Sequence, residues 1–337
     1  MRRRLLLATM LLLAAGLSVG AGELLVRAAG YKPSRFLLPL GPDLPVIHEP
    51  EPELGWKNKP GRWVWPGRGR DAGRDIVMTF WPPGLRATAP EQSARDRQLW
   101  IVGGSFTQGW AVTDEETWPW RLQKAFPELT VLNFGTAGYG TYQSLAVLER
   151  SLAAPGVDPE LVIYGFVDFH EGRNVASGSW LRAVSGTSRA GRLRVPFATL
   201  ASDGSLERHA PEATPAWPFR RQLALSFLLE SSWTDYRTQT RAAQSQSVTE
   251  TLLSELDRLS RSRGARLLVV ILSQYGPRAR AHYEEVFRRR GLEFVDCTPP
   301  PDQRVSVPGY KHPGRETHLF WSTCVADRMR QGGLADR

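Results

Sequence analysis

Ser105 lies in a segment whose residue types suit nucleophilic chemistry. The segment VGGSFTQG, residues 102–109, follows an apolar run and precedes a predicted helix. Gly103 and Gly104 allow the backbone to turn tightly, and a serine held at such a turn lies beside backbone N–H groups that could stabilise an oxyanion. A serine at this position is equally suited to cap the helix without a catalytic role. The segment alone leaves both interpretations of Ser105 open.

Three other uses of the glycine-rich segment fit it less well. A phosphate-binding loop requires a lysine, and a dinucleotide-binding loop requires the spacing G-x-G-x-x-G; residues 102–109 have neither. The nucleophile elbow of α/β-hydrolases, G-x-S-x-G, would place a glycine where Thr107 stands. The sequence therefore does not support a nucleotide-binding domain.

His312 is the candidate general base for Ser105. It precedes a proline in a loop between the fifth predicted strand and the last predicted helix. A histidine there can reach the carboxyl edge of a parallel sheet, where it could take the proton of the serine. A lone histidine in such a loop is otherwise an exposed surface residue, so the assignment depends on the rest of the chain.

The elements that would position these two residues alternate from Gln98 onward. Predicted strands cover residues 99–102, 130–134, 161–166, 266–272 and 292–295. Predicted helices cover residues 115–125, 142–152, 278–290 and 317–330, and a helix-rich stretch covers 219–262. Strands that alternate with helices are typical of a parallel α/β sheet with helices on both faces.

This α/β domain, which we place at residues 97–332, has two additions. Residues 31–96 are rich in Pro, Gly, Trp and Arg, so we expect a loop-rich cap or, in part, a linker, with a short strand at 75–80. An insertion at about residues 175–245 follows the third strand. It contains a predicted β-hairpin from 194 to 209, around a Ser-Asp-Gly turn.

Residues 1–30 predict an N-terminal signal-anchor helix that enters the membrane. Three arginines precede an apolar run from Leu5 to about Ala21. The run is at the short end of a membrane span, which needs about 20 residues, and the arginines favour a cytoplasmic N-terminus. We therefore expect an inner-membrane anchor with the domain outside the cytoplasm, periplasmic or extracellular. Small residues from Ser18 to Gly22 leave open cleavage by a signal peptidase and secretion.

The charge distribution and the residue spacing limit which partners and cofactors we expect. The formal net charge is +9, but the basic residues are scattered and form no basic helix, so we expect no nucleic-acid partner. No His, Cys or Asp spacing suggests zinc, and we expect neither a metal nor another cofactor.

Cys297 and Cys324 are the two cysteines. In an exported protein they form either one disulfide or two buried thiols.

Four segments together resemble the sequence blocks of the SGNH hydrolases, also called GDSL esterases. The blocks G-D-S-x-T-x-G, the oxyanion-glycine block, G-x-N-D and D-x-x-H-P or D-x-H-P have counterparts, in the family's order, at residues 103–109, 133–140, 164–168 and 309–313. Gly104 replaces the first aspartate, and the resemblance makes Gly138 the glycine whose N–H stabilises the oxyanion. It implies a three-layer α/β/α sandwich with a mostly parallel five-stranded sheet, as in SGNH or flavodoxin-like folds.

Two side chains that the family uses are absent. Val167 stands where the third block has an asparagine, and neither Gly309 nor Tyr310 can replace the aspartate that orients the histidine. Loss of one oxyanion donor can lower the rate about 10²–10³-fold. A bridge between Cys297 and Cys324 would close a loop of about 27 residues around the candidate base, and could partly compensate for the missing aspartate.

A polar cluster after the third predicted strand offers substitutes. His170 or Asn174 could donate to the oxyanion, and Asp168 could orient His312. Arg173 belongs to the same cluster. The cluster is equally well explained as a salt-bridged loop that supports the insertion.

The resemblance implies a serine esterase, an acyl hydrolase with Ser105 as nucleophile and His312 as general base. We expect its substrate to be an acyl ester, such as an O-acetyl ester, of an envelope glycan or lipid, with the insertion covering the site. Two alternatives remain open. One is an O-acyltransferase, and the other is a catalytically inactive member of the fold that binds a glycan or a partner protein.

Overall fold

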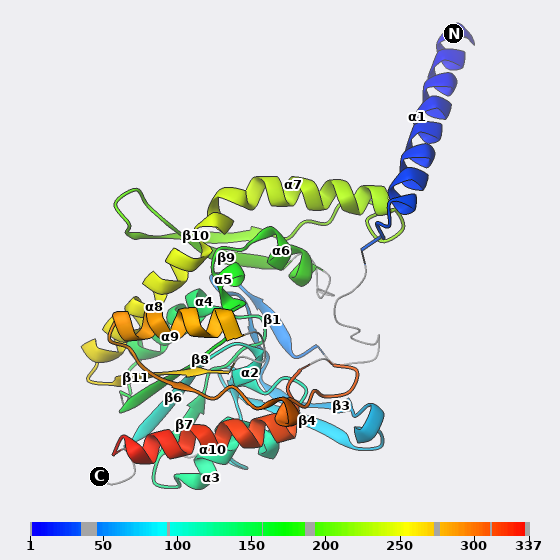
Figure 1. Cartoon of the computed structure of the whole chain (residues 1–337). Helices are drawn as coiled ribbons and strands as arrows, with labels where there is room; N and C mark the ends of the chain where they lie inside the picture. Colours follow the sequence, from blue (N-terminus) through cyan, green and yellow to red (C-terminus); the bar gives the residue numbers. More distant parts are fainter. Residues whose placement is uncertain are drawn as a thin grey trace.

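A computed structural model describes residues 2–34, 46–92, 95–156, 158–185, 193–272, 277–310 and 312–333. Its centre is an eight-stranded sheet in the order β12-β11-β8-β6-β7-β5-β4-β3 (Figure 1). The five predicted strands are present and parallel, as β6 (Gln98–Gly103), β7 (Thr130–Asn133), β8 (Leu161–Phe166), β11 (Arg266–Ile271) and β12 (Glu293–Asp296). Counted along the chain their order is 5-4-3-1-2, the doubly wound order of flavodoxin-like sheets. The predicted parallel core is confirmed.

Helices cover both faces of the parallel strands and complete the predicted three-layer α/β/α sandwich (Figure 1). One layer consists of α3 (Trp118–Ala125) and α10 (Arg315–Gln331). The other consists of α4 (Thr141–Ala153), α8 (Ser245–Ser262) and α9 (Pro277–Arg289). The two-residue period of β8 divides its side chains between them: Leu161 and Ile163 pack with α3 and α10, whereas Val162 and Tyr164 pack in the opposite core. Burial on both faces is what a parallel sheet requires.

The N-terminal cap is built of strands, which corrects the expectation of a loop-rich segment. β3 (Gly61–Pro66), β4 (Asp75–Trp81) and β5 (Leu85–Arg86) extend the sheet antiparallel beyond β7, and β1 (His48–Glu51) and β2 (Gly55–Asn58) form a separate hairpin. Along β4, Ile76, Met78 and Phe80 are buried and alternate with more exposed residues. The short strand predicted at 75–80 is therefore confirmed as β4, whereas the other strands of the cap were not predicted. Residues 35–45 of the predicted cap lie outside the described residues.

The insertion after β8 combines short helices with the predicted hairpin. The hairpin is confirmed as β9 (Arg194–Leu200) and β10 (Leu206–Ala213), which pair antiparallel. The helices are α5 (His170–Asn174), α6 (Gly178–Ser185) and α7 (Ala224–Ala243). Residues 186–192 of the predicted insertion lie outside the described residues.

α1 (Arg2–Ala28) extends away from the body of the protein and meets it at the start of α7 (Figure 1). Among the described residues it is the one helix long and apolar enough to cross a membrane, and its apolar stretch is fully exposed. Such a helix suits a signal anchor or a signal peptide.

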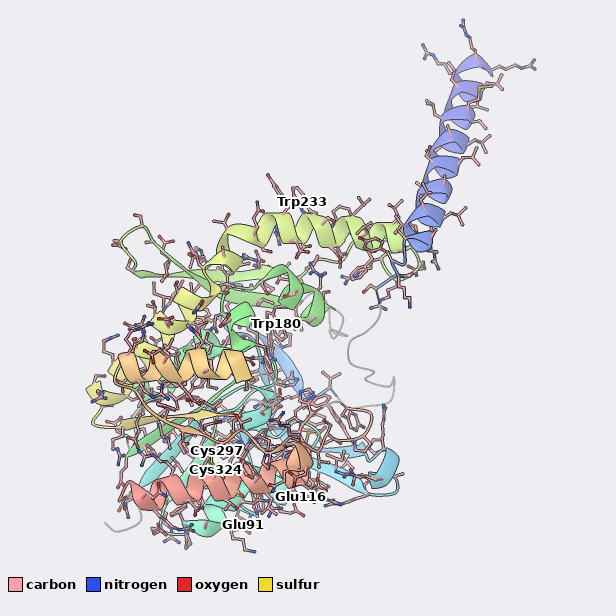
Figure 2. All side chains as sticks on the ribbon, in the orientation of Figure 1. Glu91, Glu116, Trp180, Trp233, Cys297 and Cys324 are labelled. Carbon is pink, nitrogen blue, oxygen red and sulfur yellow. A yellow bond between two sulfur atoms is a disulfide. The ribbon has the colours of Figure 1, made fainter. Side chains whose placement is uncertain are left out.

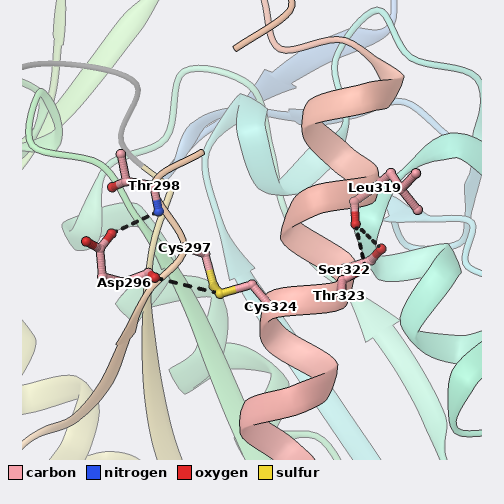
Figure 3. The surroundings of a disulfide bond; sticks show 7 residues. All are labelled: Asp296, Cys297, Thr298, Leu319, Ser322, Thr323 and Cys324. Atoms are coloured by element: carbon pink, nitrogen blue, oxygen red, sulfur yellow. Dashed lines mark hydrogen bonds between the residues drawn. A yellow bond between two sulfur atoms is a disulfide. The ribbon is translucent and has the colours of Figure 1, made fainter. Parts of the chain in front are cut away.

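A disulfide joins Cys297, just after β12, to Cys324 on α10 (Figure 3). Of the two states that the sequence left open, the structure therefore shows the bridge. It fastens both ends of the segment that contains His312, with a sequence separation of 27 residues between the cysteines. The bridge limits how far this segment can move from the sheet.

Replacing both cysteines, Cys297→Ser with Cys324→Ser, should lower the free energy of unfolding by about 3–4 kcal/mol, the chain-entropy value for a loop of this size. Equilibrium unfolding of the full chain in detergent would measure the change. Thr323→Ser, on the exposed side of α10, is the matched control. A loss below about 0.5 kcal/mol, typical of a neutral surface change, would contradict the prediction.

Candidate active site

Ser105 is the first residue of α2 (Ser105–Gln108), which follows β6 directly. The turn requires glycine: Gly103 has φ of 153°, and a Cβ there would collide with Thr107 and lie 3.0 Å from the carbonyl oxygen of Gly165. Gly109 ends α2 in the left-handed region, with φ of 74°. The chain is therefore bent sharply on both sides of the serine, which lies at the carboxyl end of a central strand.

His312 faces Ser105 across the carboxyl edge of the sheet. Its Nε2 lies 3.1 Å from Ser105 Oγ, and its Nδ1 lies 3.1 Å from the carbonyl oxygen of Tyr310. Because a carbonyl oxygen only accepts, Nδ1 carries the hydrogen in this arrangement, and Nε2 accepts from the serine hydroxyl. The two candidate residues named from the sequence are thus brought together in the geometry of a nucleophile and its base.

Aromatic side chains fix the imidazole of His312. The ring of Trp110 lies 4.4 Å from it and that of Phe106 lies 6.0 Å from it, centroid to centroid. Tyr310 packs against Trp65 of β3 and Trp110, and its hydroxyl donates to the carbonyl oxygen of Pro66 at 2.9 Å. The strands of the cap therefore hold the loop that carries the base.

Burial lowers the pKa of His312 from its ordinary value of 6.5 to about 4. The hydrogen bond to the Tyr310 carbonyl opposes this shift, and the positive charge of Arg173 adds to it. The imidazole is therefore neutral at pH 7, which is the form a general base needs.

Asp168 is not the group that orients His312, which corrects the expectation from the sequence. The Tyr310 carbonyl occupies Nδ1 of the histidine, and Asp168 Oδ1 accepts a hydrogen bond from the N–H of Phe169 at 3.0 Å. Sequence reasoning dismissed Tyr310 because its side chain cannot replace an aspartate. Every residue has a backbone carbonyl oxygen, so the sequence does not reveal that this one orients His312.

Gly138 has the backbone freedom expected of an oxyanion glycine. Its φ is 88°, and a Cβ would lie 2.8 Å from Cζ2 of Trp56. Trp56 Nε1 donates to the carbonyl oxygen of Ala137 at 2.8 Å, which fixes the peptide that carries the Gly138 N–H. Among the described residues, no acceptor is recorded for this N–H.

Asn174 does not serve as an oxyanion donor in this structure. Its amide group donates to Thr141 Oγ1 at 3.1 Å and Thr249 Oγ1 at 2.8 Å, and its Oδ1 accepts from the N–H of Tyr142 at 3.1 Å. Both amide hydrogens are therefore used to join α5 to α4 and α8. This correction leaves Asn174 as a positioning residue.

His170 remains close to the serine. Its Nδ1 lies 2.8 Å from the hydroxyl of Tyr164, and its Nε2 would lie 3.1 Å from a Cβ on Gly104, the residue before Ser105. Burial lowers the pKa of His170 well below its ordinary value, so the ring is neutral.

His318, on α10, is buried. α10 begins at Arg315, which turns His318 toward α3, where its Nδ1 accepts from the N–H of Trp118 at 3.2 Å. Burial lowers its pKa to about 3. Among the described residues, no three His, Cys, Asp or Glu side chains group to hold a metal.

Comparison with known proteins finds distant structural likenesses. No protein-family model and no curated protein matches the chain. The chain is similar to a member of the lipolytic protein G-D-S-L family from Veillonella parvula, with 11% identity and a TM-score of 0.38 over 70% of this chain and 99% of that one. It is similar to AlinE4, an SGNH-hydrolase family esterase, with 14% identity and a TM-score of 0.32 over 60% and 77%.

A third likeness is to an active-site mutant of a family two carbohydrate esterase from Clostridium thermocellum. The identity is 10% and the TM-score 0.37, over 77% of this chain and 67% of that one. TM-scores this low carry no argument about activity, so the function is argued from Ser105, His312 and their surroundings.

Proposed function

We propose that this chain is a serine esterase in which Ser105 is the nucleophile and His312 the general base. The observation that carries the proposal is the 3.1 Å separation of Ser105 Oγ and His312 Nε2. A serine within hydrogen-bond reach of a neutral imidazole, itself oriented by a third group, is the arrangement that activates a serine. The resemblance to the SGNH blocks in sequence supports the same reaction.

His312 would move one proton in each half of the reaction. Its Nε2 takes the proton as Ser105 Oγ attacks the carbonyl carbon of the ester, and it gives that proton to the departing alkoxide. Water then attacks the acyl-serine with His312 again as base, which releases the acid and restores the serine. The N–H groups of Ser105 and Gly138, with His170 Nε2 as a further candidate, would stabilise the oxyanion.

The Tyr310 carbonyl would do part of what a carboxylate does in an acid–histidine–serine triad. It fixes the ring orientation and the tautomer, with the hydrogen on Nδ1. A neutral oxygen stabilises the imidazolium less than a charged one does. We therefore expect slower acylation than in hydrolases with a full triad.

We further propose that α1 anchors the enzyme in the inner membrane with the domain outside the cytoplasm. Glu23 accepts hydrogen bonds from the N–H groups of Ala224 and Leu225, and Arg27 donates to the carbonyl oxygen of Gln222. The end of α1 thus contributes to the folded domain, which favours an uncleaved anchor. A domain confined to a membrane surface meets envelope glycans and lipids, and we place the acyl ester on one of these.

One observation favours a second function. No carboxylate contacts His312 among the described residues, as expected of a non-catalytic member of the fold that binds a glycan or a partner protein. Covalent labelling separates the two functions.

The full chain in detergent should react with a fluorophosphonate probe at Ser105. Ser105→Ala and His312→Ala should each lower the labelling rate at least about 10³-fold, because they remove the nucleophile or its base. His282→Ala, which removes a partly exposed histidine on α9, is the control and should label like the wild type. Folded wild-type protein that stays unlabelled would favour the binding function.

The low pKa of His312 predicts an unusual pH profile. Because the folded protein holds the imidazole neutral down to its pKa of about 4, kcat/KM for a neutral aryl acetate should stay level from pH 7 to about pH 5. It should fall as the pH passes below that value and His312 is protonated. Activity regained at pH 7 would show that the fold survives each exposure. If kcat/KM instead fell to half its plateau near pH 6.5, the ordinary pKa of histidine, the lowered pKa of His312 would be contradicted.

A further inference from the structure

Arg173 is a cation without a carboxylate partner, close to the reacting serine. Its guanidinium lies over the rings of Phe169 and Trp180, 4.4 and 4.5 Å from their centroids, and its Nη1 donates to the carbonyl oxygen of Tyr139 at 2.8 Å. Figure 2 labels Trp180 where the insertion meets the body of the domain. Among the described residues, no Asp or Glu contributes to the electrostatic environment of Arg173.

The guanidinium contacts both segments that carry the proposed oxyanion donors. A Cβ on Gly104, the residue before Ser105, would lie 3.1 Å from Nη1 of Arg173. Tyr139, whose carbonyl oxygen accepts from the same Nη1, follows Gly138. Arg173 is partly exposed as a residue, and the bond to Tyr139 is the one hydrogen bond recorded for its guanidinium among the described residues. The guanidinium and the imidazole of His170 both border the space that a side chain on residue 104 would fill.

The unpaired charge of Arg173 beside the active site disfavours the proposed reaction. A desolvated guanidinium without a counter-charge is costly, and burial lowers the pKa of Arg173 to about 9. The same charge lowers the pKa of His312, so it disfavours the imidazolium that catalysis must form. With His170 and His312 neutral and no carboxylate recorded beside either among the described residues, the resting site carries one net positive charge. An anion bound to Arg173 would remove both penalties.

We propose that Arg173 binds an anionic group, a carboxylate or a phosphate, that the ester substrate itself carries. A guanidinium can donate paired hydrogen bonds to such planar or tetrahedral anions while aromatic rings lie against it. The substrate then supplies the negative charge that the site lacks. This inference rests on the proposed esterase function and narrows its substrate class to acidic esters.

Three aryl acetates test the preference: 4-acetoxybenzoate with a carboxylate, 4-acetoxyphenyl phosphate with a phosphate, and neutral methyl 4-acetoxybenzoate. We expect Arg173→Gln to lower kcat/KM for a charged ester relative to the neutral one by about 10- to 100-fold, the value of one charge-assisted contact. The charged ester that loses more identifies the anion. Arg173→Lys, which keeps the charge, should retain part of the preference. Arg182→Gln, which removes a guanidinium paired with Asp235, is the matched control and should retain all of it.

An unchanged ratio of charged to neutral kcat/KM in Arg173→Gln would overturn the proposal. An equal loss for all three esters would also overturn it, because Arg173 would then act on the reaction rather than on the substrate's charge.

A binding measurement keeps the proposal separate from the esterase function. In full-length Ser105→Ala, which cannot react, 4-hydroxybenzoate or inorganic phosphate should raise the thermal midpoint, and adding Arg173→Gln should abolish the rise. If no ester is hydrolysed but this rise is seen, the esterase function fails and the anion site stands. If neither anion shifts the midpoint of Ser105→Ala, the anion site fails.

A different observation, on α7, carries a second inference. α7 begins at the end of α1, where the Glu23 carboxylate accepts from the first N–H groups of α7 at 2.9 and 2.8 Å. Gly22 of α1 packs closely on Leu225, since a Cβ on it would lie 3.1 Å from Cδ2 of that leucine. The direction of α7 is thus tied to that of α1, and α7 runs crosswise to it (Figure 1).

One face of α7 is apolar and uncovered. Leu229, Trp233 and Tyr236 are 51%, 54% and 66% exposed, and their spacing places them on one side of the helix. Figure 2 shows Trp233 on the side of α7 that faces away from the sheet, the side toward which α1 extends. Tryptophan and tyrosine gather where proteins meet the lipid headgroups.

We infer that this face of α7 lies on the surface of the bilayer that α1 enters, as an interfacial amphipathic helix does. The inference rests on the proposed anchoring by α1 and adds that the domain is held at a fixed orientation to the membrane. The active site would then act at a set height above the lipid.

Single cysteines test the contact, because both native cysteines are in the disulfide. Full-length Trp233→Cys would carry an environment-sensitive fluorophore in vesicles of phosphatidylcholine and phosphatidylglycerol that contain a lipid-attached quencher. Leu12→Cys reports on the anchor, and Glu91→Cys, at the opposite end of the domain in Figure 2, is the aqueous control. We expect quenching at positions 12 and 233 and none at 91. Quenching at 12 without 233 would overturn the contact, and no quenching at 12 would overturn the anchor and the contact with it.

Discussion

The hydrogen bond between Ser105 Oγ and His312 Nε2 is the contact on which the proposed chemistry depends. It joins two loops that are 207 residues apart in the chain, and each loop is constrained by a different part of the fold. The turn between β6 and α2 sets the position of the serine through backbone angles that only glycine adopts easily. The disulfide, the cap strands and the aromatic packing set the position of the histidine. The cap is therefore part of the active-site scaffold.

The charge of the site differs from that of an acid–histidine–serine triad. In such a triad a carboxylate gives the resting site a negative charge, whereas here a carbonyl oxygen orients His312 and Arg173 gives a positive one. This difference connects two of the three departures from the SGNH pattern, namely Gly104 and the missing aspartate before His312. Gly104 leaves space for the guanidinium, and the absence of an aspartate before His312 leaves the balancing charge to the ligand.

The sequence predicts most of the fold because its signals are periodic. Strands β6, β8 and β11 are buried on both faces and occur as largely apolar runs, which separate clearly from the helices between them. Of the cap strands only β4 was predicted, because the others are short and lie among turn-forming residues. The resemblance to the SGNH blocks likewise predicts the pairing of Ser105 with His312, because Ser105 follows the first parallel strand and the loop of His312 follows the last one.

The parts of the site that sequence could not predict depend on contacts between distant segments. A backbone oxygen orients His312, and any residue type at position 310 supplies one. Asn174 has the side chain of an oxyanion donor, but α4 and α8 supply acceptors for both of its amide hydrogens. Arg173 is named by the sequence as a member of a polar cluster, and only the structure shows that no carboxylate among the described residues is paired with it.

The tautomer of His312 tests the central claim most directly. Nitrogen-15 NMR of histidine-labelled full-length protein in detergent at pH 7, with His312→Asn to assign the signals, reports which ring nitrogen carries the hydrogen. The arrangement predicts a hydrogen on Nδ1, donated to the Tyr310 carbonyl, and a bare Nε2 that accepts from Ser105. A hydrogen on Nε2 with a bare Nδ1 would leave the serine without a base and would contradict the account.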